Sequence, residues 1–311
     1  MSHFSRTFFR VLLAMVFTVL IGAAAHAQDE YENVQINPKK LTDGIYVIME
    51  PGGNIAFITG DDATFMIDDK FAPLTEKITA AIAGITPHPV KFVLNTHWHG
   101  DHTGGNENLG KAGAVLVGHE NVRKRLSMDQ FQEFFERATP ASPPDALQTI
   151  TFTTDITFHL NGETINVFHA PNAHTDGDSI VHFTQRNVIH MGDTFFNGIY
   201  PFIDVSSGGS INGIIAAADR VLPLINDATI VIPGHGPVTD KQTLIQYRDT
   251  LVTIRDRIAA MVTAGKTLGE VRLAAPTKEF DARLGGGFIK SEQFVDIVYI
   301  SLKNGIMKIE Q

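Results

Sequence analysis

Three histidines and one aspartate fall within six consecutive positions of this chain, as His97, His99, Asp101 and His102. They follow the largely apolar run 90–94, and an apolar run that stops at a polar, glycine-rich segment is typical of a buried strand and its end loop. Neutral imidazole and carboxylate groups are ligands of zinc and similar divalent ions. Because ordinary loops rarely hold such a cluster, we expect a metal site, with two neighbouring ions if the loop wraps around them.

The run His97-Trp98-His99-Gly100-Asp101-His102 resembles the His-x-His-x-Asp-His signature of the metallo-β-lactamase superfamily. The resemblance implies that the remaining ligands follow the ends of later strands, and a suitable side chain stands at each such place. It spans roughly residues 44–237. It implies a first metal at His97, His99 and His174, and a second at Asp101, His102 and His235. Asp193 is implied to bridge the two metals, as in glyoxalase II-like members.

The resemblance also implies roles for two aspartates and the nature of the cofactors. Asp101 is expected to double as the proton carrier to the leaving group. Asp68 stands where the family keeps an aspartate that hydrogen-bonds the ligand-bearing loop, although an ordinary turn residue at a strand end fits this position equally well. The expected cofactors are two zinc ions, with iron or manganese as an alternative at one site.

The fold implied by the resemblance is an α/β, four-layer αββα metallo-β-lactamase sandwich with a C-terminal helical extension. Strand patterns that alternate with helix patterns agree with layered packing, with the helices outside. The dipeptide Asn161-Gly162 between two strand patterns predicts a two-residue hairpin turn. The patterns predict strands at 45–49, 54–59, 63–67, 90–94, 114–117, 157–160, 164–168, 179–183, 188–191 and 228–232, and helices at 73–85, 106–111 and 244–261.

The amino terminus has the three parts of a secretory signal peptide: Arg6 and Arg10, an apolar run over 11–25, and a small-residue cleavage site at 25–27. The apolar run is shorter than the ~20 residues that span a bilayer, which argues against an uncleaved anchor. We expect a periplasmic or secreted protein with no membrane attachment after cleavage. The expected domains are a signal peptide at 1–27, a hydrolase domain at 28–265 and a C-terminal helical extension at 266–311.

Charge and cysteine content argue against other kinds of function. The formal net charge is −9, and loss of the two leader arginines makes it more negative, whereas phosphate binding needs a basic surface. The chain has no cysteine, so a thiolate can serve neither as ligand nor as nucleophile. We expect a small-molecule substrate and no nucleic-acid partner, and the oligomeric state stays open.

Other histidines and one aromatic segment are expected to be structural. His119, His159 and His169 lie on or beside predicted strands, apart from the ligand series. In the segment 128–144, phenylalanines are interleaved with charges and precede a proline-rich stretch. This spacing predicts an apolar-faced helix, which is either a lid over the site or packed against the core, and packing is the commoner arrangement.

The expected chemistry is attack of a metal-bound hydroxide on a carbonyl-type bond, without a side-chain nucleophile. Fold alone does not decide the substrate. A secreted enzyme meets β-lactams more readily than glutathione thioesters, so the amide of a β-lactam ring is the first candidate, and another ester, lactone or thioester is the alternative. No lysine stands near Asp193 to bind a β-lactam carboxylate, and weaker candidates for that contact are Ser206, Ser207 and Ser210.

A non-catalytic periplasmic metal-binding protein is a second alternative. A site with three histidines keeps one coordination position open for water, which is typical of catalytic zinc. In a storage or structural site, protein ligands usually fill every coordination position of the metal, so the open position favours an enzyme. Zinc-dependent turnover of any ester, lactone or β-lactam separates the two.

The leader generates the first testable prediction. Protein recovered from a Gram-negative host is expected to begin at Gln28, because signal peptidase cleaves after the small residue at position 27. Intact mass and N-terminal sequencing measure this directly. An intact leader in the membrane fraction would show that the segment is an uncleaved anchor.

Overall fold

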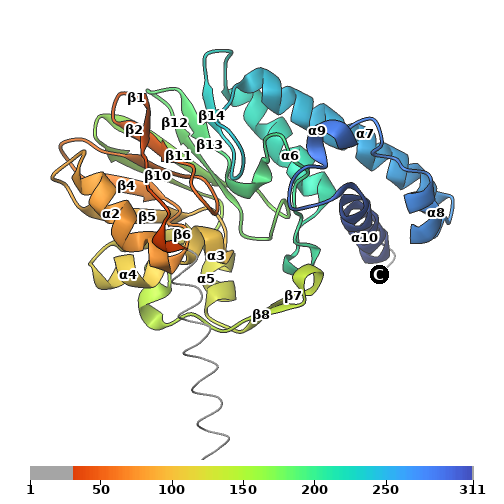
Figure 1. Ribbon diagram of the computed structural model, residues 1–311, viewed down its shortest axis with the longest axis horizontal. Helices are drawn as coiled ribbons and strands as arrows, with labels where there is room; N and C mark the ends of the chain where they lie inside the picture. The colour runs from red at the N-terminus through yellow and green to blue at the C-terminus, as the bar shows by residue number, and fades with distance from the viewer. Residues whose placement is uncertain (1–30, 310–311) are drawn as a thin grey trace, which may run out of the picture.

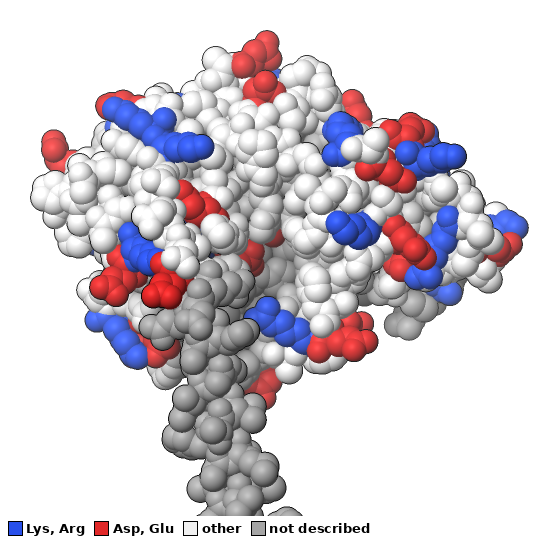
Figure 2. Space-filling view, viewed as in Figure 1, with Lys and Arg blue, Asp and Glu red and all other residues white. Residues whose placement is uncertain are grey.

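The computed structural model describes residues 31–309, so the predicted signal peptide at 1–27 lies outside the described residues. Within 31–309, no helix is both long enough and apolar enough to cross a membrane. Lys and Arg side chains on the face seen in Figure 2 lie mostly close to Asp and Glu side chains. Two arginines of the long helix Lys241–Thr263 form such ion pairs, Arg248 with Asp219 and Arg257 with Glu279.

The first sheet has seven strands in the order β1-β2-β3-β4-β5-β6-β9. Its first four strands form the predicted antiparallel meander, and β4, β5, β6 and β9 then pair in parallel. Parallel neighbours need crossover connections, and helices supply them. The strands are β1 Lys39–Thr42, β2 Ile45–Ile48, β3 Ile55–Ile58, β4 Thr64–Ile67, β5 Val90–Asn95, β6 Val115–His119 and β9 Ile150–Phe152.

The second sheet has five strands in the order β10-β11-β12-β13-β14. Its strands are β10 Asp155–Leu160, β11 Glu163–His169, β12 Ser179–Phe183, β13 Val188–His190 and β14 Ile230–Ile232. The hairpin from β10 to β11 has the predicted two-residue turn, because Leu160 pairs with Glu163. Asn161 and Gly162 have φ of 56° and 66°, which is the left-handed conformation that a type I′ turn requires.

Helices lie outside both sheets, as Figure 1 shows. Those of the first half are α2 Thr75–Ala83, preceded by a 3-10 turn at Ala72–Leu74, α3 Gly100–Thr103, α4 Asn106–Lys111 and α5 Glu120–Leu126. Those of the second half are α6 Ile211–Val221, α7 Lys241–Thr263, α8 Leu268–Leu273, α9 Asp281–Leu284 and α10 Ser291–Ile309. The helices predicted at 73–85, 106–111 and 244–261 are therefore present.

Both sheets are buried on two faces, which makes the architecture the predicted four-layer αββα sandwich. In β3, Ala56 and Ile58 belong to the apolar cluster between the sheets, whereas Ile55 and Phe57 pack with Ile78 of α2 on the opposite face. Successive side chains of a strand point to opposite faces, so a strand that is apolar throughout must be covered twice.

The helices after β14 pack on the outer face of the second sheet. Ile214 of α6, Leu251 of α7 and Phe294 of α10 share one buried cluster with Phe168 and Ile189 from that sheet. The C-terminal segment is helical, as predicted, and α10 packs against α7, α6 and α8. The protein's largest apolar cluster therefore includes residues from the predicted extension.

The predicted helix within 128–144 is wrong. The chain forms a two-stranded antiparallel ribbon, β7 Gln130–Gln132 and β8 Arg137–Thr139, joined by a 3-10 turn at Glu133–Phe135. Phe131 is 57% exposed, so the phenylalanines do not share a buried face. The rings of Phe134 and Phe135 lie 5.3 and 4.8 Å from that of Phe202, and this contact with a distant loop outweighs the local helical spacing.

Two leucines test the role of the helical layer in stability. Leu251 in α7 is 1% exposed, and Leu273 at the end of α8 is 88% exposed. Leu251→Ala is expected to lower the free energy of unfolding by about 2–5 kcal/mol, because it leaves a cavity in a packed cluster. Leu273→Ala, the matched control, is expected to change it by about 0.5 kcal/mol or less. Urea denaturation measures both, and equal effects would contradict this account of the layer.

Candidate metal centre

The four clustered side chains of the signature lie directly beyond β5. This strand ends at Asn95, His97 and His99 follow on the loop, and Asp101 and His102 lie in the short helix α3. The bend over residues 96–98, between Asn95 and α3, brings all four side chains to one end of the first sheet. The sequence pattern predicted this strand and its loop.

Three later segments bring side chains to the same place. His174 lies on the loop after β11, Asp193 in a 3-10 turn after β13, and His235 in the turn after β14. Strands β13 and β14 are parallel neighbours, so their carboxyl ends meet at one edge. The structure therefore brings together all seven residues that the resemblance marked as ligands.

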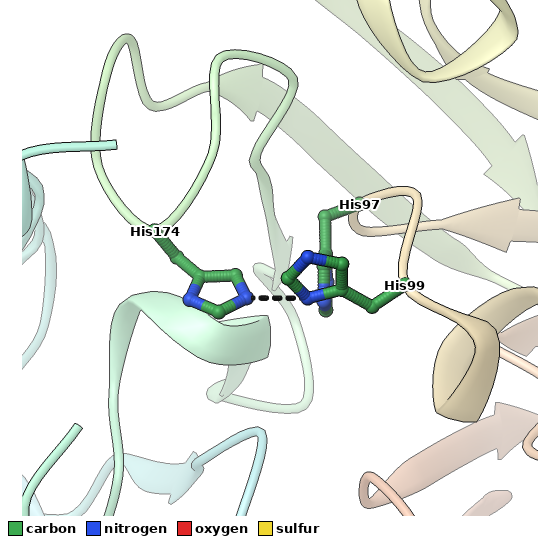
Figure 3. Close-up of side chains that lie close together, drawn as sticks. All are labelled: His97, His99 and His174. Carbon is green, nitrogen blue, oxygen red and sulfur yellow. Dashed lines mark hydrogen bonds between the residues drawn. The ribbon is translucent and has the colours of Figure 1, made fainter. Parts of the chain in front are cut away.

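His97, His99 and His174 form the first group that could hold a metal ion. One nitrogen from each ring lies within 4.8 Å of the other two, and all three residues are buried. Nε2 of His174 is 2.9 Å from Nδ1 of His99, and Figure 3 shows the three rings converging from two loops. Three imidazoles around one point are typical of a catalytic zinc site with a free coordination position.

Asp101, His102 and His235 form a second such group beside the first. Nε2 of His235 lies 3.3 Å from a carboxylate oxygen of Asp101. One oxygen of Asp193 is 3.1 Å from Nε2 of His102, and its other oxygen is 3.3 Å from Nε2 of His235. That second oxygen is also 3.6 Å from Nε2 of His174. Asp193 therefore lies between the two groups.

Unsatisfied atoms in the centre support metal binding. Nε2 of His97, Nε2 of His102 and one oxygen of Asp193 are buried without a hydrogen-bond partner. Burying polar atoms unpaired is costly, and a coordinated cation would remove that cost. The donors are nitrogen and oxygen only, which suits zinc and also iron or manganese. The residues present therefore fit divalent ions.

The protonation states of the two groups differ. Burial lowers the pKa of His97 and His174, that of His174 to about 4, so both rings stay neutral as a ligand must. At His235 the effect of burial is outweighed by the carboxylates of Asp193 and Asp101, which raise the pKa to about 9. A proton thus balances these carboxylates in the second group, in the place where a cation would supply the positive charge.

Asp68 holds the ligand-bearing loop in place. Its carboxylate accepts hydrogen bonds from the backbone N–H of Thr96 at 2.6 Å and from the Thr96 hydroxyl at 2.7 Å. It also pairs with Nδ1 of His102 at 2.7 Å, which leaves Nε2 of that ring to face the centre. Such outer partners orient a ligand and fix its tautomer. The position agrees with the hydrogen bond that the resemblance implied.

Asp204 has a comparable position that sequence reasoning missed. Its carboxylate lies 3.0 Å from Nε2 of His99, which leaves Nδ1 of that ring to face the first group. Burial opposes its charge, but hydrogen bonds from His99, Ser206 and Ser207 hold the pKa of Asp204 well below its usual range. Asp204 lies on a loop with no motif, so only the folded chain identifies it.

Lys70 is a second residue that the sequence did not reveal. Its side chain is fully buried, and its ammonium donates to the backbone carbonyls of Glu50 at 2.7 Å and Gly53 at 2.5 Å. Gly53 lies against a ligand, since a Cβ atom there would be 2.1 Å from Cε1 of His102. Burial lowers the pKa of Lys70 to about 8. Lys70 thus holds the 50–53 turn against His102.

The three serines proposed for substrate binding have other contacts. Ser206 donates its hydroxyl to Asp204, and the backbone N–H of Ser207 donates to the same carboxylate. The hydroxyl of Ser210 accepts the N–H of Gly213 and so caps the N-terminus of α6. None of the three lines the cavity at the metal centre, so the structure offers no support for a substrate contact.

The remaining histidines of the sequence analysis have structural positions. The rings of His119 and His169 are stacked, with centroids 3.8 Å apart. Nδ1 of His119 accepts the N–H of Asn121 and caps α5. His159 is an exposed residue of β10. None of these rings belongs to a group that could hold a metal among the described residues.

A cavity of about 560 Å³ opens onto the centre. Of the seven clustered residues, His99, Asp101, Asp193 and His235 line it. Its other lining residues come from the ribbon, from the loops around the centre and from the C-terminal segment: Gly52, Phe71, Trp98, Gly100, Gln132, Phe135, Arg137, Thr139, Phe202 and Phe288.

Comparison with known proteins identifies the family. A sequence profile described as "Metallo-beta-lactamase superfamily" matches residues 49–252, which is more than half of the 311-residue chain. The chain therefore belongs to the metallo-β-lactamase superfamily, a class of metal-dependent hydrolases. The matched range contains all seven clustered ligand candidates.

Individual relatives agree with this assignment. A hydroxyacylglutathione hydrolase from Polaromonas sp. is 28% identical over 194 residues, which are 60% of this chain and 62% of that protein. The chain spans less than two thirds of the length of this and two other curated relatives that it matches.

Solved structures show the same fold. A metallo-β-lactamase from Pontibacter korlensis is 21% identical with a TM-score of 0.56, over 70% of this chain and 99% of that chain. A variant of the sec-alkyl sulfatase PisA1 is 16% identical with a TM-score of 0.65, over 85% of this chain and 50% of that chain. At these identities the likeness concerns the fold alone.

Asp193 generates the prediction for this centre. Wild-type protein purified without chelator is expected to carry close to two metal equivalents by elemental analysis. Asp193→Ala is expected to lose one of them, because it removes the carboxylate that lies between the two groups. Asp193→Cys is expected to keep zinc, since thiolate is a strong zinc donor. Asp227→Ala changes an exposed aspartate away from the centre and serves as the control. Two zinc ions retained in Asp193→Ala would disprove the bridging position.

Proposed function

We propose that this protein is a dinuclear zinc hydrolase that cleaves a carbonyl-type bond in a small organic substrate met outside the cytoplasm. The observation that carries the proposal is the convergence of five histidines and two aspartates, with three buried donor atoms left unpaired, at the mouth of a cavity. In this arrangement His97, His99 and His174 would hold one ion. Asp101, His102 and His235 would hold the other, and Asp193 lies between the two groups.

Bound there, two divalent ions would supply an activated water and an electrophilic contact for the carbonyl oxygen. The protein's own residues set the geometry. Asp68 and Asp204 each fix the orientation of one ligand imidazole. Rigid outer contacts of this kind hold a reactive arrangement within a few tenths of an ångström, which efficient catalysis requires.

Asp101 is proposed to carry the proton to the leaving group. Its side chain is 24% exposed, compared with 5% for Asp193, so Asp101 is the more accessible of the two carboxylates that line the cavity. A carboxylate in this position can exchange a proton with a substrate bound in the cavity, and Nε2 of His235 lies 3.3 Å from it. No serine, threonine or cysteine nucleophile is needed.

The first candidate substrate is the amide of a β-lactam ring. The predicted secretory leader would place the enzyme where such compounds are met. The cavity of about 560 Å³ is within the range of sites for drug-sized molecules. Its aromatic lining suits the bicyclic and acyl groups of these compounds.

A thioester or ester is the second candidate, and one observation favours it. The relative from Polaromonas is named a hydroxyacylglutathione hydrolase, and it is a match by sequence rather than by fold alone. Asp193 also agrees with the ligand set of glyoxalase II-like members, in which an aspartate bridges the metals. A lactone is related chemically, and the same panel of substrates tests it.

A hydrolysis panel with the zinc-loaded mature chain tests the proposal. It contains nitrocefin, a penicillin, a carbapenem, an acyl-homoserine lactone, S-lactoylglutathione and bis-p-nitrophenyl phosphate. We expect turnover of at least one carbonyl compound, its loss with a chelator and its return with zinc. His97→Ala is expected to lower kcat/KM by roughly 100-fold or more, because metal-activated water is lost.

His159→Ala is the matched control, since His159 is an exposed histidine of β10 outside the cluster. It is expected to keep the wild-type rate. Stoichiometric zinc binding without turnover of any carbonyl compound would favour the non-catalytic metal-binding alternative. Turnover of the phosphodiester alone would instead contradict the choice of bond.

A further inference from the structure

The cavity beside the metal centre has an apolar, aromatic wall that continues from the ligands themselves. The ring of Trp98 lies 4.7 Å from that of His99. The ring of Phe202 lies 5.9 Å from the same imidazole. The ring of Phe288 from the C-terminal segment is 5.9 Å from that of His235. A substrate bound at the metal-binding groups would therefore lie among aromatic rings.

Two aromatic residues of the cavity lining, Phe135 and Phe288, are largely exposed. Phe135 is 45% exposed and Phe288 is 49% exposed, and both line the cavity. Large apolar side chains left open to water at the rim of a concave site are typical of surfaces that bind an apolar ligand. The cavity thus favours a substrate with an apolar or aromatic body.

One positively charged side chain lies in the lining of this cavity. Arg137, on β8 of the ribbon, is the only lysine or arginine among the described residues that line the cavity. Its exposed side chain has no hydrogen bond or ion pair with any described residue. Most other arginines differ: Arg125, for example, is paired with Asp176. Arg137 is therefore free to bind a ligand.

We propose that Arg137 binds a carboxylate of the substrate and makes the enzyme selective for anionic substrates with an apolar body. This inference rests on the proposed function and names the substrate class of the same site. A guanidinium can donate two parallel hydrogen bonds to a carboxylate, which gives both affinity and orientation. Two of the candidate metal ligands, Asp101 and Asp193, line the same cavity as Arg137. Arg137 would thus bind the anion of a substrate whose scissile carbonyl lies at the metal-binding groups.

Arg137 supplies a cation at the cavity, although no lysine stands near Asp193 in the sequence. The cation comes from the 128–144 ribbon, which the sequence pattern predicted as a packed helix. Gln132 and Thr139, on the two strands of this ribbon, line the cavity with it. Because one ribbon supplies both polar groups and Phe135, changes in this segment are expected to alter substrate preference rather than metal binding.

Ligand binding to the zinc-loaded protein tests the proposal without turnover. Trp98 is the chain's only tryptophan and lines the cavity, so its fluorescence reports occupancy. The probes are 3-phenylpropanoate and 3-phenylpropanamide, which match in size and differ in charge. We expect the wild type to bind the acid more tightly than the amide. Arg137→Gln is expected to reduce this preference by roughly tenfold, and Arg137→Lys by less.

Lys124→Gln is the control. It removes one positive charge from the exposed face of α5, outside the cavity, and is expected to keep the wild-type preference. An equal loss in both glutamine variants would mean that overall charge sets the preference, which would overturn the role of Arg137. A preference that persists in Arg137→Gln would show that the carboxylate binds the metals directly, which would also overturn the role of Arg137.

The two hypotheses fail in different ways. If the loaded protein hydrolyses no carbonyl compound but shows the Arg137-dependent preference, the proposed function is wrong and the anion site remains. If it hydrolyses substrates of the panel and Arg137→Gln keeps the wild-type preference in both binding and KM, the function remains and the anion site is wrong.

Discussion

The charge on Asp193, buried between two groups of imidazoles, is the constraint on which the centre depends. A buried carboxylate without compensation is unstable, and two buried imidazole nitrogens beside it also lack hydrogen-bond partners. A pair of divalent cations, as proposed above, would satisfy all of these atoms together. The surrounding residues keep the ligand nitrogens directed toward these ions. Asp68 pairs with one nitrogen of His102 and Asp204 with one nitrogen of His99, so that the other nitrogen of each ring faces the centre.

The sandwich makes this arrangement possible because its strands end where their loops can meet. The loop after β5 belongs to one sheet and those after β11, β13 and β14 to the other, and the two sheets pack against each other through a shared apolar cluster. Rigid strands fix the ends of the loops, so side chains almost 140 positions apart in the sequence meet at one carboxylate: Nε2 of His97 and Nε2 of His235 lie 3.8 and 3.3 Å from the same oxygen of Asp193. Gly53 and Gly234 let the backbone lie directly against His102 and Asp193, where a Cβ atom would not fit.

Specificity and chemistry come from different parts of the chain. The metal groups belong to the sandwich, whereas the cavity walls include Phe135 and Arg137 from the ribbon and Phe288 from the C-terminal segment. Segments added at the edge of a conserved scaffold change the shape and charge of a site without moving the reactive groups. This division explains how one superfamily fold can accommodate substrates as different as those named for its relatives, and it directs the search for this protein's substrate toward anions.

The sequence by itself determined the features that depend on short-range patterns. The dense signature at 97–102, the Asn161-Gly162 turn and the apolar repeat of α7 each need only near neighbours, and each agrees with the structure. The later ligand positions could be named because each follows a recognisable strand. Only the tertiary structure decided that 130–139 forms a ribbon, that the serines at 206 and 210 bond within the protein, and that Lys70, Arg137, Asp204 and Phe288 surround the centre. These features depend on contacts between segments that are distant in the sequence. Such contacts outweigh local conformational preference, and they produce no periodic pattern of residues that a reading of the sequence could detect.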